Sequence, residues 1–349
     1  MQFSFIIPVY NRPSEVQELL ESLSRLDYDK PFEVVIIEDG STEKSDTIVS
    51  NFQNQLMISY YFKPNSGPGD SRNFGMKRAK GTYFLILDSD VLLPSDYLKQ
   101  VEAALTKYYV PCFGGIDAAH PSFTPLQKAI NFVMTSFLTT GGVRGTTTSI
   151  GSKLQSETKK QFQPRSFNMG LSKEAFELSG GFGSIHPGED PDLSLRLIAM
   201  GLETDLFNNV KVYHKRRISW SKFWYQVVKF GKCRPILFLW HRDLLEQKAM
   251  SSLKFWFPSL FLLGTIFSVM CAIFGVWYFL YLLLAYVLLV FFAAWYSQQS
   301  IGIATRAVVA LFVQFLGYGY GFLISYVQIF IFGKEPKEAF PELFFTTKL

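Results

Sequence analysis

Short apolar runs alternate with segments of helical spacing over the first third of the chain. Four runs have the length of buried strands: 3–9, 32–37, 58–62 and 83–87. Apolar residues at helical spacing predict helices between and after them: 13–26, 42–51, 69–79 and 95–107. Strands that alternate with helices build a parallel sheet covered on both faces. The pattern therefore predicts an α/β domain with a mostly parallel central sheet.

The last part of the chain has a different pattern, because it is a long apolar stretch that almost lacks charged residues. Between positions 254 and 334, Arg306 is the only charged residue. A helix crosses a bilayer with about 20 apolar residues, so the region is long enough for three transmembrane helices: 255–274, 277–296 and 307–331. Gly275 is the expected turn between the first two, with Trp277 and Tyr278 at the membrane interface. A run of this length argues against the alternative of a buried core helix.

A basic block precedes this apolar region. Nine Lys or Arg residues and no Asp or Glu lie between Lys211 and Arg242. Such cations mark the cytoplasmic side of a membrane, and the aromatic residues among them suit helices that lie in the headgroup region. The chain opens without a signal peptide, so residues 1–250 are expected in the cytoplasm. Membrane lipid is therefore the expected partner of the net charge of +5, and nucleic acid is not.

These patterns divide the chain into four parts: a cytoplasmic catalytic domain over 1–212, basic interfacial helices over 213–252, transmembrane helices over 253–333 and a tail over 334–349. Three crossings would place the tail outside, whereas two crossings plus a re-entrant or interfacial segment would keep it inside. A Ser/Thr-rich stretch with cations at 141–166 is typical either of a surface linker or of a functional lid. Three scattered cysteines form no metal or disulfide pattern. The oligomeric state is left open.

The strand predicted at 83–87 ends in two carboxylates one residue apart, Asp88 and Asp90. Alternate residues of an extended chain share a face, so both carboxylates can point at one spot. Hard oxygen ligands of this kind suit Mg2+ or Mn2+ that also holds phosphate oxygens. His214, at the end of a later apolar strand, either completes the metal shell or is a structural polar residue. A solvated acidic turn is the alternative for the Asp-Ser-Asp motif alone.

Polar residues follow other predicted strands at the same position. Asn11 follows the first strand, Asp39 the second and Asp88 the fourth. In such sheets ligands bind at the carboxyl ends of the strands. The sequence therefore predicts one crevice that receives polar groups from separate strands. The glycines at 67–69 either present backbone N–H groups to a phosphate or form an ordinary tight turn.

Seven segments, taken in chain order, resemble glycosyltransferase family 2. The early ones are Phe5–Arg12, Val34–Ser41 and Asn65–Gly75; the later ones are Asp88–Asp90, Asn168–Gly170 with Gly180–Phe182, and Gly188–Asp190. The apolar C-terminal helices resemble those of the membrane-anchored exopolysaccharide branch, whose members extend lipid-linked sugars at the inner face of a bacterial membrane. Processive synthases of the family carry a Gln-x-x-Arg-Trp motif, but Gln226 is followed here by Val-Val-Lys-Phe. Processive polymerisation is therefore not expected.

The resemblance implies a GT-A fold, a nucleotide-sugar donor, a divalent metal ion and inversion at the anomeric carbon. On the donor side, it implies that Asp39 binds the uracil or its ribose and that Pro8 and Asn11 line the nucleotide pocket. Arg72 would lie near the donor. Asp88 would hold the sugar or ribose, and Asp90 the metal ion, for which His214 is a further candidate ligand.

On the acceptor side, the resemblance assigns Asn168 to the substrate-binding segment and Asp190 to the role of general base. Such a carboxylate accelerates transfer by roughly 100- to 10,000-fold when it takes the proton of the acceptor hydroxyl. Acidic residues also favour helix starts, so capping of the helix expected at 191–200 is the alternative. Adjacent residues cannot both face one point, which leaves Glu189 to position or bind the acceptor. Arg234 belongs to a group of cations, Arg216, Arg217, Lys232 and Arg234, that would bind a polyprenyl diphosphate or simply attract anionic lipid.

The expected function is that of an inverting, metal-dependent glycosyltransferase. It would move a sugar, from UDP-sugar by resemblance, to a lipid-linked saccharide in exopolysaccharide, O-antigen or capsule biosynthesis. One alternative is a polyprenyl-phosphate monosaccharide transferase. Another, of a different class, is an inactive nucleotide-sugar-binding scaffold of a polysaccharide synthase complex. The expected location is the bacterial inner membrane, with several crossings and the catalytic domain in the cytoplasm.

Overall fold

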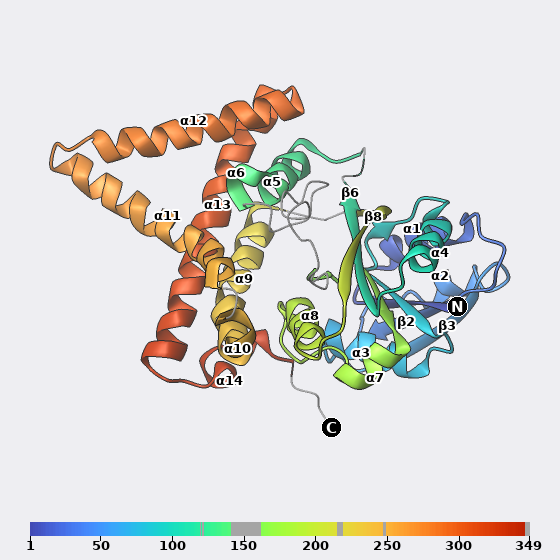
Figure 1. Ribbon diagram of the computed structural model, residues 1–349. Helices are drawn as coiled ribbons and strands as arrows, with labels where there is room; N and C mark the ends of the chain where they lie inside the picture. Colours follow the sequence, from blue (N-terminus) through green and yellow to red (C-terminus); the bar gives the residue numbers. More distant parts are fainter. Residues whose placement is uncertain (119, 121, 141–161, 215–218, 247–248, 346–349) are drawn as a thin grey trace. The chain divides into compact units, whose positions relative to one another are not determined.

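The computed structural model describes residues 1–118, 120, 122–140, 162–214, 219–246 and 249–345 (Figure 1). These residues form two compact units, and each is described by itself. Unit 1 comprises Met1–His120, Ile150–Lys215 and Phe344–Leu349, and unit 2 comprises Pro121–Ser149 and Arg216–Leu343. Most of the stretch expected as a linker or lid, 141–161, lies outside the described residues, as do Arg216 and Arg217.

Unit 1 is built on an eight-stranded sheet with the strand order β3-β2-β1-β4-β7-β6-β8-β5. The strands are β1 (Phe3–Val9), β2 (Glu33–Asp39), β3 (Met57–Lys63), β4 (Tyr83–Leu87), β5 (Val91–Leu92), β6 (Cys112–Ala118), β7 (Asn168–Ser172) and β8 (Thr204–His214). The strands β3, β2, β1 and β4 run parallel, which confirms the mostly parallel sheet. β7 was not predicted and runs antiparallel to β4 and β6. Because the chain passes through unit 2 between β6 and β7, no βαβ crossover sets a parallel direction there.

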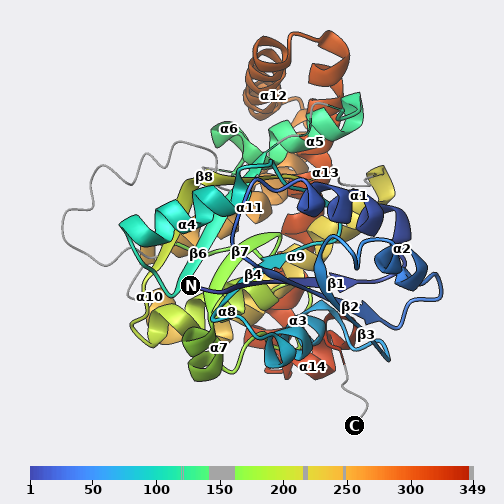
Figure 2. The same ribbon diagram turned by 90° about the vertical axis from the view of Figure 1, so that its right-hand side faces the viewer.

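Helices cover both faces of this sheet (Figure 2). One face carries α1 (Pro13–Ser24), α2 (Asp46–Ser50) and α4 (Tyr97–Lys107); the other carries α3 (Pro68–Arg78), α7 (Lys173–Ser179) and α8 (Glu189–Ala199). Alternate residues of one strand supply the two cores, since Phe5 and Ile7 of β1 join one hydrophobic cluster and Ile6 joins the other. The predicted helices of this unit are confirmed to within a few residues at each end.

Unit 2 is helical. Its elements are α5 (Pro125–Thr135), α6 (Phe137–Thr140), α9 (Trp220–Trp240), α10 (Arg242–Glu246), α11 (Ala249–Ile273), α12 (Tyr278–Gln298), α13 (Ile301–Tyr326), the π-helix η1 (Val327–Ile331), α14 (Pro336–Ala339) and the 3-10 helix η2 (Pro341–Leu343). Three segments are long and apolar enough to cross a membrane, Phe255–Ile273, Tyr278–Gln298 and Ile301–Ile331, close to the three predicted. The turn at Gly275 between α11 and α12 has a positive φ of 84°.

The helix α13 is the centre of unit 2, because α5, α9, α11 and α12 all pack against it. Glycines bring α9 and α13 into close contact. A Cβ atom on Gly231 would lie 2.2 Å from the backbone oxygen of Tyr318, and one on Gly321 would lie 2.2 Å from that of Val228. Small residues at such a crossing let two helix backbones approach each other, as in membrane helix pairs.

Candidate active site

The candidate site lies at the carboxyl ends of the parallel strands of unit 1. β1 pairs with β2 on one side and with β4 on the other, so the strand order reverses beside it. A reversal of this kind leaves a crevice where ligands bind in α/β sheets. Asn11 follows β1, Asp39 ends β2 and Asp88 follows β4. The predicted convergence of polar groups from separate strands is thus built into the topology.

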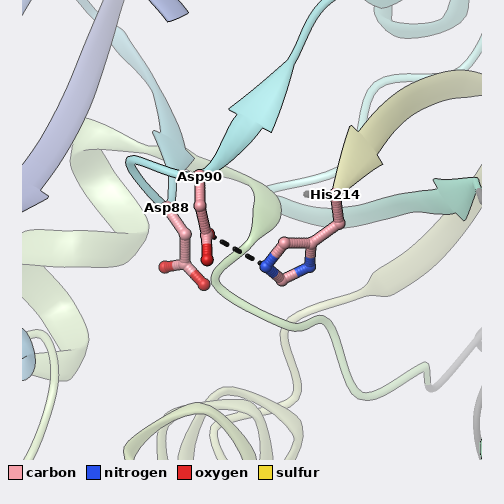
Figure 3. Close-up of side chains that lie close together, drawn as sticks. All are labelled: Asp88, Asp90 and His214. Carbon is pink, nitrogen blue, oxygen red and sulfur yellow. Dashed lines mark hydrogen bonds and ion pairs between the residues drawn. The ribbon is translucent and has the colours of Figure 1, made fainter. Parts of the chain in front are cut away.

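Asp88, Asp90 and His214 form a compact cluster at this edge (Figure 3). One ligand atom from each residue lies within 4.8 Å of the others. The two aspartates occupy the turn between β4 and β5, and the imidazole ends β8. β5 and β8 pair with Val91 opposite His214, which places Nε2 of His214 2.9 Å from Oδ1 of Asp90. The register of a two-residue strand therefore brings together groups that are 124 positions apart.

This cluster fits a divalent cation. Two carboxylates suit Mg2+ or Mn2+, and an imidazole is a common ligand of transition-metal ions. The His214 Nδ1 atom lies 3.8 Å from Oδ1 of Asp117, an arrangement that would orient the ring with Nε2 toward the metal position. Burial alone would raise the pKa of Asp90, but His214 and Arg12 hold it well below its usual range, so the carboxylate is charged at neutral pH. Arg12 contacts the second oxygen of Asp90.

Arg72 of α3 connects the candidate metal cluster to the acidic pair of α8. Its Nη2 atom donates to Oδ1 of Asp88 at 2.9 Å, and its Nη1 atom donates to Oε1 of Glu189 at 3.1 Å. Oδ1 of Asp190 lies 4.0 Å from Nη1. Only 4% of the Arg72 side chain is exposed, so these charges interact with little screening by solvent. One guanidinium therefore binds two carboxylates from distant parts of the chain and lies near a third.

The two carboxylates at the start of α8 have opposite protonation properties. Burial would raise the pKa of Glu189, but His186 and Arg72 lower it to about 2. Burial and the charge of Glu189 raise the pKa of Asp190 to about 6, against the opposing charge of Arg72. Oδ2 of Asp190 accepts a hydrogen bond from the Ser166 backbone at 3.2 Å, whereas its buried Oδ1 atom has no hydrogen-bond partner among the described residues.

Gly188 allows this arrangement, because its φ of 129° lies where side chains are strained. Its N–H donates to Oε2 of Glu189 at 3.0 Å. Glu189 is thereby fixed as an ion-pair partner of Arg72 and His186. Asp190 is left as the carboxylate of the pair that can accept a proton near neutral pH.

The Asp39 carboxylate is hydrogen-bonded to the loop that precedes α3. The side chain accepts from the backbone N–H groups of Ser66 at 3.0 Å and Gly67 at 2.9 Å, and pairs with Lys63 at 2.5 Å. Asn65 donates to the backbone oxygen of Asp39 at 2.8 Å. In this geometry the carboxylate shapes the glycine loop beside the crevice. Direct binding of uracil or ribose by Asp39 stays a prediction.

The other residues assigned to substrate binding have varied positions. Asn11 has a φ of 51°, and its Oδ1 atom accepts from the backbone of Thr42 at 2.8 Å, which ties the end of β1 to that of β2. Pro8 lies within β1 opposite Ile37. Asn168 is fully buried, accepts from Tyr97 at 2.8 Å and donates to the Val210 backbone at 3.1 Å.

Two of the predicted substrate-binding residues are therefore engaged elsewhere in the structure. Asn168 fastens β7 to β8 and α4, so its amide does not face the crevice. Arg234 belongs to unit 2, where its guanidinium lies over the ring of Phe255 at 3.7 Å from the ring centre. That contact is with an aromatic face, and polyprenyl diphosphate binding by Arg234 stays a prediction.

The sequence did not single out Arg12, Lys63 or His186 as parts of the site. Arg12 directly follows Asn11 in the first motif, but its partner Asp90 is 78 positions away. His186 is one of four histidines in the chain and lies three residues before Glu189, close enough in the sequence for a local pair. The histidine spacing was the available signal, whereas the partner of Arg12 required the fold.

Comparison with known proteins finds relatives among the glycosyltransferases. Residues 4–173 match the family model described as Glycosyl transferase family 2. Poly(ribitol-phosphate) beta-N-acetylglucosaminyltransferase TarS of Staphylococcus aureus is 37% identical over 112 residues, which is 31% of this chain and 20% of TarS. An uncharacterized glycosyltransferase of Rickettsia felis is 42% identical over 96 residues, 28% of this chain and 16% of that protein.

Among solved structures, the mannosyltransferase PcManGT from Pyrobaculum calidifontis, in complex with GDP-Man and Mn2+, has a TM-score of 0.62. It is 15% identical, and the match covers 88% of this chain and 86% of that chain. At this identity the likeness concerns the fold alone.

Residues 4–173 therefore resemble glycosyl transferase family 2, as the motifs predicted, and the chain has a GT-A-like fold. The match with TarS spans only about a fifth of the length of that protein.

Proposed function

We propose that the protein is a membrane-associated, metal-dependent glycosyltransferase that inverts the anomeric carbon of a nucleotide-sugar donor. One observation carries this proposal: Arg72 joins the Asp88, Asp90 and His214 cluster to the Glu189 and Asp190 pair within one crevice. A family 2 domain with a carboxylate cluster for cations and a separate carboxylate of raised pKa has the parts that sugar transfer needs.

In the proposed reaction the acceptor hydroxyl oxygen forms a bond to the anomeric carbon while the bond from that carbon to the diphosphate breaks. Asp190 takes the hydroxyl proton, and its pKa of about 6 suits a base that works near neutral pH. The electron pair of the broken bond leaves with the nucleoside diphosphate. A direct displacement inverts the configuration, so a second carboxylate is not needed as a nucleophile.

Asp88, Asp90 and His214 are the residues that would hold the cation, which supplies positive charge for the leaving diphosphate when bound. Arg72 contributes a fixed positive charge beside Asp88. Glu189 keeps Arg72 in place and is itself held by His186. Each charged group around the crevice thus has a partner that fixes its orientation.

The donor and acceptor classes are inferred from several sources. The resemblance of the motifs favours a UDP-sugar as the donor. A GDP-sugar is the alternative donor, because PcManGT binds GDP-Man. The apolar helices of unit 2 favour an acceptor that is presented by a membrane, such as a polyprenyl-diphosphate-linked saccharide. We place the reaction at the cytoplasmic face of a bacterial inner membrane.

The test uses the full chain purified in detergent. Release of nucleoside diphosphate is measured from UDP-glucose, UDP-galactose, UDP-N-acetylglucosamine and GDP-mannose, each with Mn2+, Mg2+ or EDTA. We expect turnover of one donor that needs the cation, loss of turnover in Asp90→Asn, and normal turnover in the matched control Asp96→Asn, whose carboxylate is exposed at the start of α4. Full activity in EDTA would contradict metal dependence.

The acceptor is tested separately with lipid extracts. Transfer to a polyprenyl monophosphate alone would favour the monosaccharide transferase, whereas transfer to a polyprenyl-diphosphate-linked saccharide supports the proposal. Donor binding without turnover of any donor, in the presence of either extract, would favour an inactive scaffold.

A further inference from the structure

The C-terminal end of the described chain returns to unit 1. Phe344 forms an antiparallel bridge with Ile185, and the backbone N–H of Phe345 donates to the oxygen of Ser184 at 3.1 Å. The Phe345 ring lies against Gly67, where a Cβ atom would come within 2.3 Å of it. These contacts join the loop before α8 and the loop before α3. The chain thus leaves unit 1 after β8 and comes back to it after the apolar helices.

This return requires the chain to cross the membrane an even number of times. Unit 1 has a charged, water-exposed surface and lies on one side of a membrane. Because Phe344 and Phe345 contact unit 1, they lie on that same side. A chain that starts and ends on one side crosses the bilayer an even number of times. Three apolar helices among the described residues are long enough to cross, so at least one of them does not.

The helices α11 and α12 have the features of crossing helices. Their apolar windows of 19 and 21 residues are each only 11% buried within the protein. The α12 helix has Trp277 and Tyr278 at one end and Trp295 and Tyr296 at the other, all of them exposed. Aromatic residues of this kind gather at both membrane interfaces, and the apolar residues between them are long enough to span the hydrocarbon.

The helix α13 differs, because 44% of its apolar window is buried within the protein. Its centre contacts α9, a helix that carries four cations: Lys222, Lys229, Lys232 and Arg234. The Ser325 hydroxyl donates to the backbone oxygen of Lys232 at 2.7 Å. If α13 crossed the bilayer, α9 would carry these cations into the hydrocarbon, at a cost of about 2.5–3.5 kcal/mol for each one near the centre.

The charges that flank the helices support the same conclusion. The turn between α11 and α12, residues 274–277, has no charged residue. The hairpin that α11 and α12 form has cations before it or at its start: Arg242, Lys248 and Lys254. The helix α13 has cations at its start and after its end: Arg306, Lys334 and Lys337. Cations close to membrane helices are retained on the cytoplasmic side. The uncharged turn therefore lies on the far side, with both ends of α13 on the near side.

We infer that the chain crosses the membrane twice, through the α11–α12 hairpin, and that α13 lies in the headgroup region on the side of unit 1. The exposed apolar surface of the hairpin binds lipid acyl chains. The exposed face of α13, which includes Val309 and Tyr320, contacts the membrane surface. The inference rests on the membrane association in the proposed function but not on its chemistry.

The test maps single cysteines with a membrane-impermeant maleimide. Cys112 and Cys233 are buried, and Cys271→Ala removes the third native thiol. Into this background we place Lys107→Cys on unit 1, Phe274→Cys at the hairpin turn, Ser297→Cys at the end of α12, or a cysteine added after Leu349. Full-length protein in sealed membrane vesicles is labelled before and after detergent, and the background without an added cysteine is the control.

We expect the cysteines at 107, 297 and the C-terminus to be labelled from one face, and the cysteine at 274 from the other. Labelling of the C-terminal cysteine together with position 274 would overturn the inference in favour of three crossings. Labelling of all four positions from one face would overturn the crossing of the hairpin. Recovery of the protein in the soluble fraction would also overturn it. None of these readouts needs catalysis, so failure of the glycosyltransferase assay leaves them unchanged.

Discussion

Glu189 and Asp190 are neighbours in the sequence, but their surroundings give the two carboxylates different protonation properties. Glu189 contacts both His186 and Arg72, and its pKa is lowered. Asp190 lies beside this negative charge with one buried oxygen that lacks a hydrogen-bond partner among the described residues, and its pKa is raised. Two carboxylates whose environments move their pKa values apart are typical of sites in which one residue orients and the other transfers protons.

The pH dependence of turnover follows from Asp190. A base must be deprotonated, so kcat should rise with pH through an inflection near the pKa of about 6 and reach a plateau above it. Glu189→Gln removes the neighbouring negative charge and frees Arg72, and both changes favour the ionised form of Asp190. The inflection in this variant should therefore move to lower pH. Initial rates at saturating donor between pH 5 and 8 would check both expectations, and an identical inflection in both proteins would contradict them.

Replacement of the base itself should affect turnover more than binding. Asp190→Asn preserves the size of the side chain and should lower kcat by roughly 100- to 10,000-fold. The Kd of the donor nucleotide, measured by calorimetry, should change little because Asp190 is assigned to the acceptor hydroxyl. Asp96→Asn is the matched control. Unchanged turnover in Asp190→Asn would move the base to another residue.

The cluster at the end of β4 predicts a graded loss of cation affinity. His214→Ala removes one of the three candidate ligands, and Asp117→Asn removes the group nearest to Nδ1 of that ring. Loss of a group that only orients a ligand costs about 10- to 100-fold in affinity, and loss of the ligand should cost at least as much. Electron paramagnetic resonance of free Mn2+ measures both affinities without any reaction. Equal affinity in wild type and His214→Ala would exclude the imidazole as a ligand.

The sequence singled out the carboxylates of the candidate site, but it did not indicate which residues lie beside them. Asp88 and Asp90 were found because a buried apolar run ends directly before them. His214 was found only as one of two alternatives, since its place beside Asp90 depends on the pairing of β5 with β8. The sequence suggested a substrate-binding role for Asn168 and gave no sign that this residue is buried. No local pattern shows that a polar side chain will fill a gap between β6 and β8.

At the scale of elements, strands and helices with strong periodicity were predictable, and short or returning segments were not. The β1, β2, β3 and β4 strands follow the apolar runs, and α8 follows its acidic start. The bridge of Phe344 to Ile185 has no sequence signal, because a single pair of residues forms no period. It nevertheless connects the loop before α8 to the loop before α3.

This contact predicts a coupling between Gly67 and Phe345. Gly67 has a φ of 93°, so Gly67→Ala introduces backbone strain of about 1–3 kcal/mol and places a methyl group against the Phe345 ring. In a Phe345→Ala background the ring is gone and only the strain remains. Gly67→Ala should therefore destabilise the protein less in that background than in the wild type.

Thermal unfolding of the four proteins gives this double-mutant cycle. Residues in contact typically couple by about 0.5–3 kcal/mol, whereas distant residues are additive. Phe332→Ala, at an exposed ring beyond η1, is the control for loss of an aromatic side chain. Additive effects of the Gly67 and Phe345 substitutions would show that the C-terminal segment does not lie on the glycine loop in solution.

At the scale of the whole molecule, the sequence showed which segments are apolar but left open how many cross a membrane. Hydropathy alone treats α11, α12 and α13 alike, since their apolar windows have mean hydropathies of 1.9, 2.2 and 1.8. The difference lies in their partners. α13 packs against α5 and α9, and the chain then returns to unit 1.

Two matched substitutions separate the roles of α12 and α13 within the intact chain. Leu288 lies at the middle of α12 and is 45% exposed, and Tyr320 lies four residues past the centre of the apolar segment Ile301–Ile331 and is 49% exposed. An arginine at the centre of a crossing helix costs about 2.5–3.5 kcal/mol of insertion free energy, whereas an arginine at the headgroup level reaches water and anionic lipid. Leu288→Arg should therefore lower the carbonate-resistant membrane fraction strongly, and Tyr320→Arg should leave it close to wild type. Equal losses in the two variants would mean that α13 is inserted as deeply as α12, and the chain would then have to cross the bilayer with its cationic neighbour α9.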